Sequence, residues 1–196
     1  MIKNEKPSDV ASREVNSTEK EIVVLTIGHS TRELQEFVQL LQENNVECVV
    51  DVRTIPGSRH NPQYNKETLA AGLNKANIEY QHMSGLGGLR HTKSDSPNTG
   101  WKNKSFRGYA DYMLTDDFQK YLNELIELSR KKLVAIMCAE AVPWRCHRSL
   151  IADALLIRGI SVEHIIGAGR RQTHQLTPFA KVEGKKIFYP PEDFIE

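Results

Sequence analysis

Short apolar runs alternate with segments of helical periodicity along most of this chain, and this alternation restricts the possible folds more than any other feature. A β-branched run at 22–27 is followed by a helical face formed by Leu34, Phe37, Val38 and Leu41. The next apolar run, at 46–52, has the valine-rich character of a strand buried on both faces. The alternation predicts an α/β fold: a single three-layer domain with a mostly parallel sheet of about five strands and helices on both faces.

Capping residues indicate where the helices begin. Ser30 and Glu33 have the spacing of a capping box, which predicts a first helix from Ser30 to about 44–45. Asn65 is expected to cap a helix at 66–77, and Thr115 to cap the most amphipathic helix of the chain. The other expected elements are strands at 78–82, 133–137 and 160–166, a helix at 147–158 ended by Gly159, and a hairpin around Glu183-Gly184.

Two stretches lack any sustained period. Residues 1–20 are charged and contain no apolar segment, so we expect a disordered N-terminal tail before a single α/β domain at 21–196. The pattern also fails at about 83–110, where we expect a long loop. A loop of this length inside a compact domain is usually functional or mobile.

Composition excludes several classes of protein. The net charge is only +1, so bulk charge does not attract nucleic acid. Three cysteines are too few for a disulfide framework and favour a reducing, cytoplasmic location. No apolar run approaches the roughly 20 residues that cross a bilayer, so we expect no membrane association. The sequence requires no cofactor and sets no oligomeric state.

The polar residues concentrate where the predicted strands end. In open α/β sheets ligands bind at the carboxyl ends of the strands, so these residues are the candidates for a site. They are His29 after the first strand; Asp51, Arg53, Ser58 and Arg59 after the second; and Cys138, Glu140, Arg145, Cys146, His147 and Arg148 after the fourth.

Three kinds of chemistry are compatible with the segment CAEAVPWRCHR at 138–148. A cysteine at a strand tip followed by a loop, an arginine and a helix is the arrangement of cysteine phosphatases and rhodaneses. However, six residues separate Cys138 from Arg145, and Glu140 would repel an anion. The second possibility is Glu140 as nucleophile or general acid/base, with Cys138, His147, His29 and Asp51 as further catalytic candidates. The third is a zinc site, which the spacing of these cysteines and histidines does not favour.

Each of these residues also has a structural explanation. Cys138 could simply fill the core at the end of a buried strand, and His147 could cap the following helix. Asp51 and Arg53 could form an ion pair beneath the loop. The clustering of these residues, rather than any one of them, indicates a site.

The loop at 83–110 bears on the choice of ligand. Its lysines and arginines are interleaved with Trp101 and Tyr109, which could stack on nucleic-acid bases. The alternative is a solvated flap whose aromatic residues anchor it to the rest of the protein.

Four ordered motifs together resemble one family. They are TIGHST at 26–31, VVDVR at 49–53 followed by P-x-S-R at 56–59, LGGLR at 86–90, and CAE with P-x-x-CHR at 138–148. This set resembles the family catalogued as domain of unknown function 488 and covers about 21–165. The resemblance implies a single α/β domain with these motifs gathered at one site, and it implies no particular activity.

The leading hypothesis is a hydrolase or group transferase acting on an anionic substrate, such as a nucleotide or nucleic acid. Glu140 would be the nucleophile or acid/base, and His29 or His147 would transfer protons. The substrate would be held by Arg53, Ser58, Arg59, Arg145, Arg148, Trp101 and Tyr109. The alternatives are a non-catalytic nucleic-acid-binding module and a protein with a thiolate or zinc site.

Overall fold

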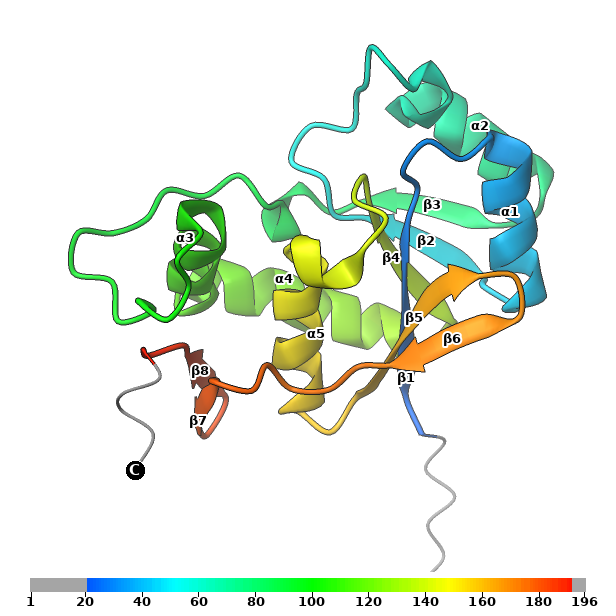
Figure 1. Cartoon of the computed structure of the whole chain (residues 1–196). Coiled ribbons are helices and arrows are strands. Elements are labelled where there is room, and N and C mark those ends of the chain that lie inside the picture. The colour runs from blue at the N-terminus through cyan, green and yellow to red at the C-terminus, as the bar shows by residue number, and fades with distance from the viewer. Residues whose placement is uncertain (1–20, 192–196) are drawn as a thin grey trace, which may run out of the picture.

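A central sheet organises the computed structural model, which describes residues 21–191 (Figure 1). Five of its strands are parallel: β1 (Val23–Gly28), β2 (Cys48–Asp51), β3 (Glu79–His82), β4 (Val134–Cys138) and β5 (Ser161–Gly167). A sixth strand, β6 (Arg170–Thr173), pairs antiparallel with β5. The order is β3-β2-β4-β1-β5-β6, so β4 and β1 lie in the middle of the sheet.

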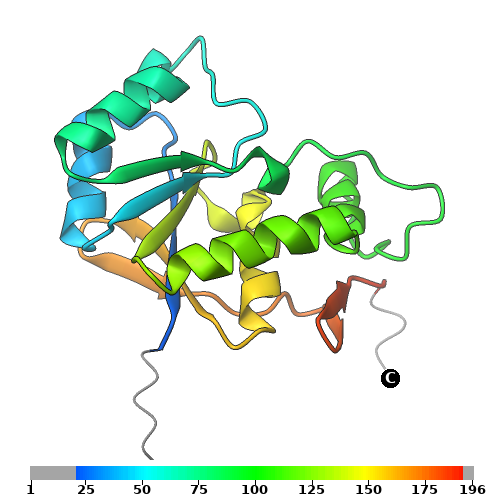
Figure 2. The ribbon, with the colours of Figure 1, turned by 180° about the vertical axis from the view of Figure 1, so that it is seen from behind.

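Helices cover both faces of this sheet (Figures 1 and 2). One face carries α1 (Leu34–Glu43) and α2 (Lys66–Lys75). The other carries α3 (Lys104–Met113), α4 (Asp116–Ser129) and α5 (Arg148–Leu156). Alternate side chains of each strand pack against opposite helical layers, which produces two separate cores. The predicted three-layer α/β architecture is therefore confirmed.

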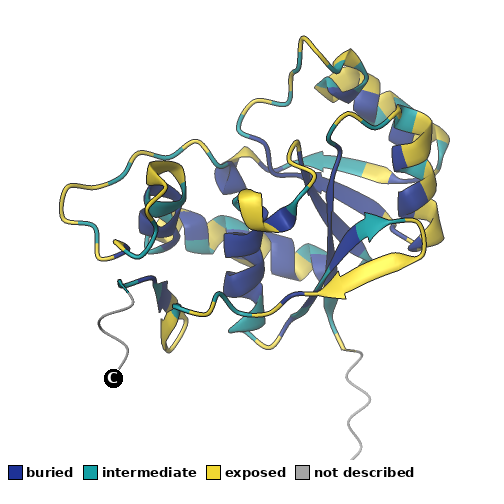
Figure 3. Cartoon of the chain, viewed as in Figure 1, coloured by how far each residue is buried: buried dark blue, intermediate teal, exposed yellow. Residues whose placement is uncertain are grey.

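Short elements complete the description. Three single turns of 3₁₀-helix occur: η1 (Pro62–Tyr64), η2 (Ser84–Leu86) and η3 (Pro143–Arg145). The hairpin of β7 (Lys181–Glu183) and β8 (Lys186–Phe188) turns at Gly184, as predicted, with a φ of 61°. Figure 3 shows the buried strands and inner helical faces in dark blue and the exposed strand β6 in yellow. Among the described residues, no helix combines the length and apolar character needed to cross a bilayer.

Some helix boundaries agree with the capping analysis and others do not. Thr115 caps α4 as predicted, since its Oγ1 accepts a hydrogen bond from the Phe118 N–H. The predicted capping box at Ser30 is wrong, because α1 begins at Leu34 and Glu33 is the residue before it. Ser30 instead has a φ of 50° and donates its main-chain N–H to Ala139. This hydrogen bond joins the chain just after β1 to the chain just after β4, at a position that precedes α1.

Asn65 precedes α2 as expected, but its side chain does not cap that helix. Its Oδ1 accepts a hydrogen bond of 2.7 Å from the main-chain N–H of Ser58. The amide therefore fixes the loop that follows β2 to the start of α2.

The segment at 83–110 is more regular than predicted. It contains η2 and most of α3, which Asn103 caps by accepting from the Ser105 N–H at 2.8 Å. The buried face of α3 includes Tyr109 and Met113. The glycine and polar residues that precede α3 mask its short helical periodicity in the sequence. Strand β6 was not predicted either, since all of its residues are polar and exposed. The predicted tail at 1–20 lies outside the described residues.

Candidate functional site

A cavity of about 800 Å³ lies at the carboxyl ends of β1, β2 and β4. Three motif-bearing loops meet there, because the parallel register brings the ends of these strands to one edge of the sheet. The candidate residues that line the cavity are His29, Arg53, Ser58, Cys138, Glu140, Arg145, Cys146 and His147. Gly88 and Leu89, which belong to the motif LGGLR, also line the cavity.

Two cysteines line the cavity, and one buried arginine contacts both of them. The Nε of Arg148 donates to Cys138 Sγ at 3.0 Å, and the main-chain N–H of Arg148 donates to Cys146 Sγ at 3.5 Å. Arg148 thus contacts both sulfurs. Arg148 is only 1% exposed. It therefore holds the thiols from below, and the prediction that it contacts a ligand directly has to be corrected.

The thiols titrate very differently. Burial by itself would raise the pKa of Cys146. The Cys138 thiol and the charge and N–H groups of Arg148 have a larger, opposite effect, so the pKa is lowered from 9.0 to about 6. Burial and the neighbouring sulfur raise the pKa of Cys138 well above its usual value. At neutral pH the pair thus carries one thiolate, on Cys146, which accepts a hydrogen bond from the Arg148 main-chain N–H.

His147 lies beside this thiolate. Its Nε2 is 3.0 Å from the Val52 carbonyl oxygen, which can only accept, so Nε2 carries the proton. Burial lowers the pKa of His147, and the neutral ring then has a free lone pair on Nδ1, 3.6 Å from Cys146 Sγ. The ring also packs against Tyr109, with 5.1 Å between centroids. His147 is therefore placed to accept a proton from Cys146.

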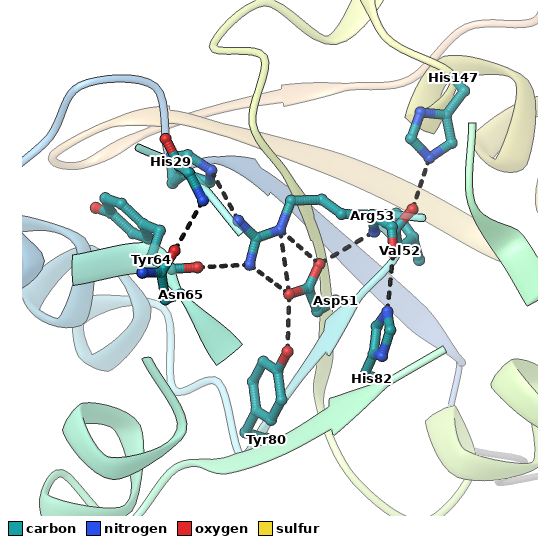
Figure 4. Close-up of polar contacts among 10 residues, drawn as sticks. His29, Asp51, Val52, Arg53, Tyr64, Asn65, Tyr80, His82 and His147 are labelled. Carbon is teal, nitrogen blue, oxygen red and sulfur yellow. Dashed lines mark hydrogen bonds and ion pairs between the residues drawn. The ribbon is translucent and has the colours of Figure 1, made fainter. Parts of the chain in front are cut away.

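A second network supports the wall formed by β2 (Figure 4). Arg53 donates from Nη2 and Nε to the two carboxylate oxygens of Asp51, at 2.6 and 2.9 Å. The Tyr80 hydroxyl donates to the same carboxylate at 2.8 Å. Asp51 is fully buried, so it acts as the structural partner of Arg53. Its predicted catalytic role is not compatible with this position.

His29 belongs to this network as well. Its Nδ1 lies 2.8 Å from the Ser30 carbonyl oxygen, and its Nε2 lies 3.4 Å from Arg53 Nη1. The ring stacks on Tyr64 with 4.0 Å between centroids. Burial and then the Arg53 charge lower the pKa of His29 to about 4, so the ring is neutral at physiological pH. Both ring nitrogens are already engaged, which favours a structural role over proton transfer.

A buried chain of hydrogen bonds, which was not predicted from the sequence, extends from Arg148 away from the cavity. Arg148 Nη1 donates to Thr26 Oγ1 at 3.2 Å, and that hydroxyl lies 2.7 Å from His164 Nδ1. His164 Nε2 lies 3.0 Å from His174 Nδ1, and His174 Nε2 lies 2.8 Å from Asp153. With neutral rings, every donor in this chain meets an acceptor, which fixes the orientation of the Arg148 guanidinium. Only the alternation of polar with apolar residues along β5 could have indicated His164.

The glycines of two motifs have a steric explanation. A Cβ on Gly28 would overlap the carbonyl oxygen of Glu140 and lie 2.8 Å from Arg148 Nη2. A Cβ on Gly88 would lie 2.6 Å from His147 Nδ1. Backbone at both positions must approach the site more closely than any side chain would permit. TIGHST and LGGLR therefore include glycine because the chain passes directly against the thiol-bearing loop.

Three predicted ligand-binding residues lie elsewhere. Tyr109 is fully buried and donates its hydroxyl to the Leu86 carbonyl at 2.9 Å, so it cannot stack on a base. Trp101 packs among Phe106, Phe179 and Tyr189. Arg59 is exposed but outside the cavity lining. The loop aromatics thus serve as anchors, and the nucleic-acid-binding alternative loses its stacking residues.

Glu140 lies at the exposed edge of the cavity. Its main-chain carbonyl oxygen accepts a hydrogen bond from Arg148 Nη2. This bond fixes the backbone at Glu140, whose side chain is exposed. In residues 21–191 no three His, Cys, Asp or Glu side chains are grouped so as to hold a metal ion. The zinc alternative therefore has no ligand set in this part of the chain.

The comparisons with known proteins identify the family. The family model described as Domain of unknown function DUF488 matches residues 33–155, which is more than half of the chain. The chain therefore belongs to this family, as the resemblance of its motifs implied. The comparisons with curated proteins and with solved structures found no match.

Proposed function

We propose that this member of the DUF488 family is an enzyme, a hydrolase or group transferase, whose nucleophile is the Cys146 thiolate and whose substrate is anionic. The observation that carries the proposal is the setting of Arg148. A buried guanidinium is costly unless an anion lies against it. Within residues 21–191 no carboxylate lies at ion-pair distance from Arg148, and the groups that can ionise against it are the two thiols.

The nearest carboxylate in its network supports this assignment. Asp153 is separated from Arg148 by Thr26 and two histidines, so its charge is not in contact with the guanidinium. A thiolate on Cys146 balances the Arg148 charge locally. A stable thiolate in a cavity wall is the form in which a cysteine acts as a nucleophile.

Neighbouring groups support an anionic substrate. Arg145 is exposed at the cavity and has no ion-pair partner among the described residues. Helix α5 begins at Arg148, directly after Cys146 and His147, so the partial positive charge of its first turn lies beside the Cys146 sulfur. Ser30 and Ser58 add hydroxyl groups to the lining. These groups would bind an anion while the sulfur reacts.

The rim of the cavity suggests that the substrate also has an apolar or planar part. Ile55 and Leu89 line the cavity and are 70% and 72% exposed, although large apolar side chains are usually covered. Trp144, in the loop that carries Arg145, is 62% exposed. A nucleotide has both an anionic group and a planar ring, and it is the substrate class that fits this combination.

In the proposed reaction Cys146 Sγ attacks the electrophilic centre of the substrate. The bond to sulfur forms as the bond to the leaving group breaks, and the leaving group takes a proton from the Glu140 carboxyl group. Glu140 then removes a proton from water, or from another acceptor, which attacks the covalent intermediate and releases the thiolate. His147 Nδ1 accepts the thiol proton whenever Cys146 is protonated. Glu140 thus keeps its predicted acid/base role, while the nucleophile is the thiolate.

Alkylation with a charged and an uncharged reagent tests the proposal without knowledge of the substrate. Iodoacetate and iodoacetamide both transfer a carbon to sulfur and release iodide, but only iodoacetate is an anion. We expect Arg145→Ala to lower the ratio of the iodoacetate rate to the iodoacetamide rate at Cys146 by about two- to fivefold, the range of an exposed charge pair. The measurement is mass spectrometry of the Cys146 peptide over time.

Arg59→Ala is the matched control, because Arg59 is also exposed but does not line the cavity. Its rate ratio should equal that of the wild-type protein. Equal ratios for wild type and Arg145→Ala would contradict the anion site. The assignment of Cys146 as the nucleophile would be contradicted if Cys146 did not react at pH 7 and if Cys146→Ser kept as many reactive thiols as the wild-type protein.

A further inference from the structure

We propose that Cys138 and Cys146 form a reversible redox pair, which a small hydroperoxide converts into an intramolecular disulfide that switches off the nucleophile. The inference rests on the reactive Cys146 of the proposed function, and it adds a regulatory reaction at the same site. Its basis is that one arginine contacts the sulfurs of both cysteines at the wall of one cavity.

The geometry brings both sulfurs to one place. Arg148 donates from Nε to Cys138 Sγ at 3.0 Å and from its main-chain N–H to Cys146 Sγ at 3.5 Å, so both sulfurs lie against the same residue. Both thiols line the same cavity, so an oxidant that reaches one sulfur lies next to the other. A disulfide requires the two sulfurs to approach to roughly 2.05 Å, so the chain that joins them must adjust.

The connecting loop can supply this movement. Ala139, Glu140 and Ala141 are exposed, as are Trp144 and Arg145. Exposed loop residues with few packing contacts adjust more readily than residues of a buried strand. Cys138 lies at the end of β4 and Cys146 just after η3, so a shift of the loop can move Cys146 while the sheet stays in place.

The third cysteine is excluded by its position. Cys48 opens β2 and is in register with Val134, at the other end of β4 from Cys138. Four residues of strand correspond to about 13 Å, far beyond disulfide reach. Burial also raises the pKa of Cys48 to about 11, so it remains a thiol at neutral pH.

The chemical steps balance with hydroperoxide as the oxidant. The Cys146 thiolate attacks the terminal peroxide oxygen, the O–O bond breaks, and the departing alkoxide or hydroxide takes a proton to leave as an alcohol or water. Cys146 is then a sulfenic acid. The Cys138 sulfur attacks Cys146 Sγ as its proton passes to the departing hydroxide, so a second water leaves and the disulfide forms. Two electrons pass from the two sulfurs to the peroxide.

The neighbouring charges fit the order of these steps. Cys146 is the better first nucleophile because its pKa is lowered, while Cys138 keeps its proton until the sulfenic acid has formed. Once both sulfurs are in a disulfide, neither can carry the negative charge that faces Arg148. Reduction by a dithiol would restore the thiolate.

Peptide mapping tests the inference directly. The full chain is treated with hydrogen peroxide at pH 7, remaining thiols are blocked with N-ethylmaleimide, and tryptic peptides are identified by mass spectrometry. Trypsin separates Cys138, in peptide 133–145, from Cys146, in peptide 146–148. We expect these two peptides to be linked by one disulfide and Cys48 to be fully blocked. Dithiothreitol should return both cysteines to the blockable form.

The variant Cys138→Ser supplies the control for the second step. Without a resolving thiol, Cys146 should proceed to the sulfinic and sulfonic acids, with gains of two and three oxygen atoms. The same over-oxidation in the wild-type protein, or a disulfide that links two molecules on a non-reducing gel, would overturn the inference.

Alkylation separates this inference from the proposed function. If Cys146 reacts with iodoacetamide with a midpoint near pH 6 but peroxide yields no linked peptides, the redox pair is wrong and the thiolate stands. If the linked peptides form but Arg145→Ala leaves the alkylation ratio unchanged, the redox pair stands and the anionic substrate is wrong.

Discussion

Replacing Cys138 by alanine should raise the pKa of Cys146 from about 6 to between about 7 and 8. The variant removes the S–H that donates to the Cys146 thiolate and leaves Arg148 held by Thr26 and the Glu140 carbonyl. A hydrogen bond to a charged group contributes about 1.5–3 kcal/mol, and about 1.4 kcal/mol corresponds to one pKa unit. The loss of one such bond thus corresponds to a rise of about one to two units.

The assay is the second-order rate of iodoacetamide alkylation at Cys146, measured by peptide mass from pH 4.5 to 10. With a pKa of about 7.5 the thiolate fraction at pH 6 falls from about one half to about 3%. A thiolate of higher pKa is also about fivefold more nucleophilic, so the net rate at pH 6 should fall about threefold. The midpoint of the pH profile is the decisive quantity, because limited access slows alkylation equally at every pH.

Cys48→Ala is the matched control, since it removes a thiol outside the cavity and should leave the midpoint near pH 6. A wild-type midpoint near 9 would refute the assignment of the thiolate to Cys146. An unchanged midpoint in Cys138→Ala would refute the role of the Cys138 S–H and leave Arg148 as the whole cause.

Two further predictions concern stability. Gly28→Ala should lower the free energy of unfolding, measured by urea denaturation, by about 3 kcal/mol or more, because its Cβ would overlap the Glu140 carbonyl oxygen. Gly167→Ala is the control and should lower it far less, because nothing lies within 4 Å of a Cβ there. Equal losses in the two variants would contradict the close approach at Gly28. Lowering the pH from 7 to 5 should reduce the free energy of unfolding by about 2 kcal/mol for each of His29 and His164. Burial lowers both folded pKa values from 6.5 to about 4, so the unfolded chain binds protons first and stability falls as the pH drops through this range. Coincident unfolding curves at pH 7 and pH 5 would refute this prediction.

Much of the architecture could be predicted from local patterns. The apolar runs that became β1, β2 and β4 are long enough to be recognised, and Thr115 has the side chain that the first turn of α4 requires. The errors have specific causes. Ser30 satisfies the capping spacing but is held by Ala139, which is more than one hundred residues away. Strand β6 has no apolar face for a pattern to detect.

The candidate site was predictable in its place and less so in its chemistry. The rule that strand ends meet at one edge placed Cys138, Glu140 and His147 around one cavity. Glu140 was the expected nucleophile or general acid/base because a carboxylate at a strand tip is conspicuous in a sequence. We propose Cys146 as the nucleophile instead, because its lowered pKa depends on the neighbouring Cys138 and Arg148, which no residue spacing reveals.

Residue order alone therefore accounts for the layers, the sheet and the edge at which polar residues collect, since these follow from side-chain periodicity and from the parallel direction of the strands. Which polar groups remain free for a ligand was decided only by three-dimensional packing. Arg148 is occupied by Thr26 and Cys138, and Asp51 by Arg53 and Tyr80. A hydrogen bond satisfies a buried group wherever its partner lies in the chain, and the Thr26 to His164 contact spans 138 positions. Such partners therefore cannot be predicted from the local sequence.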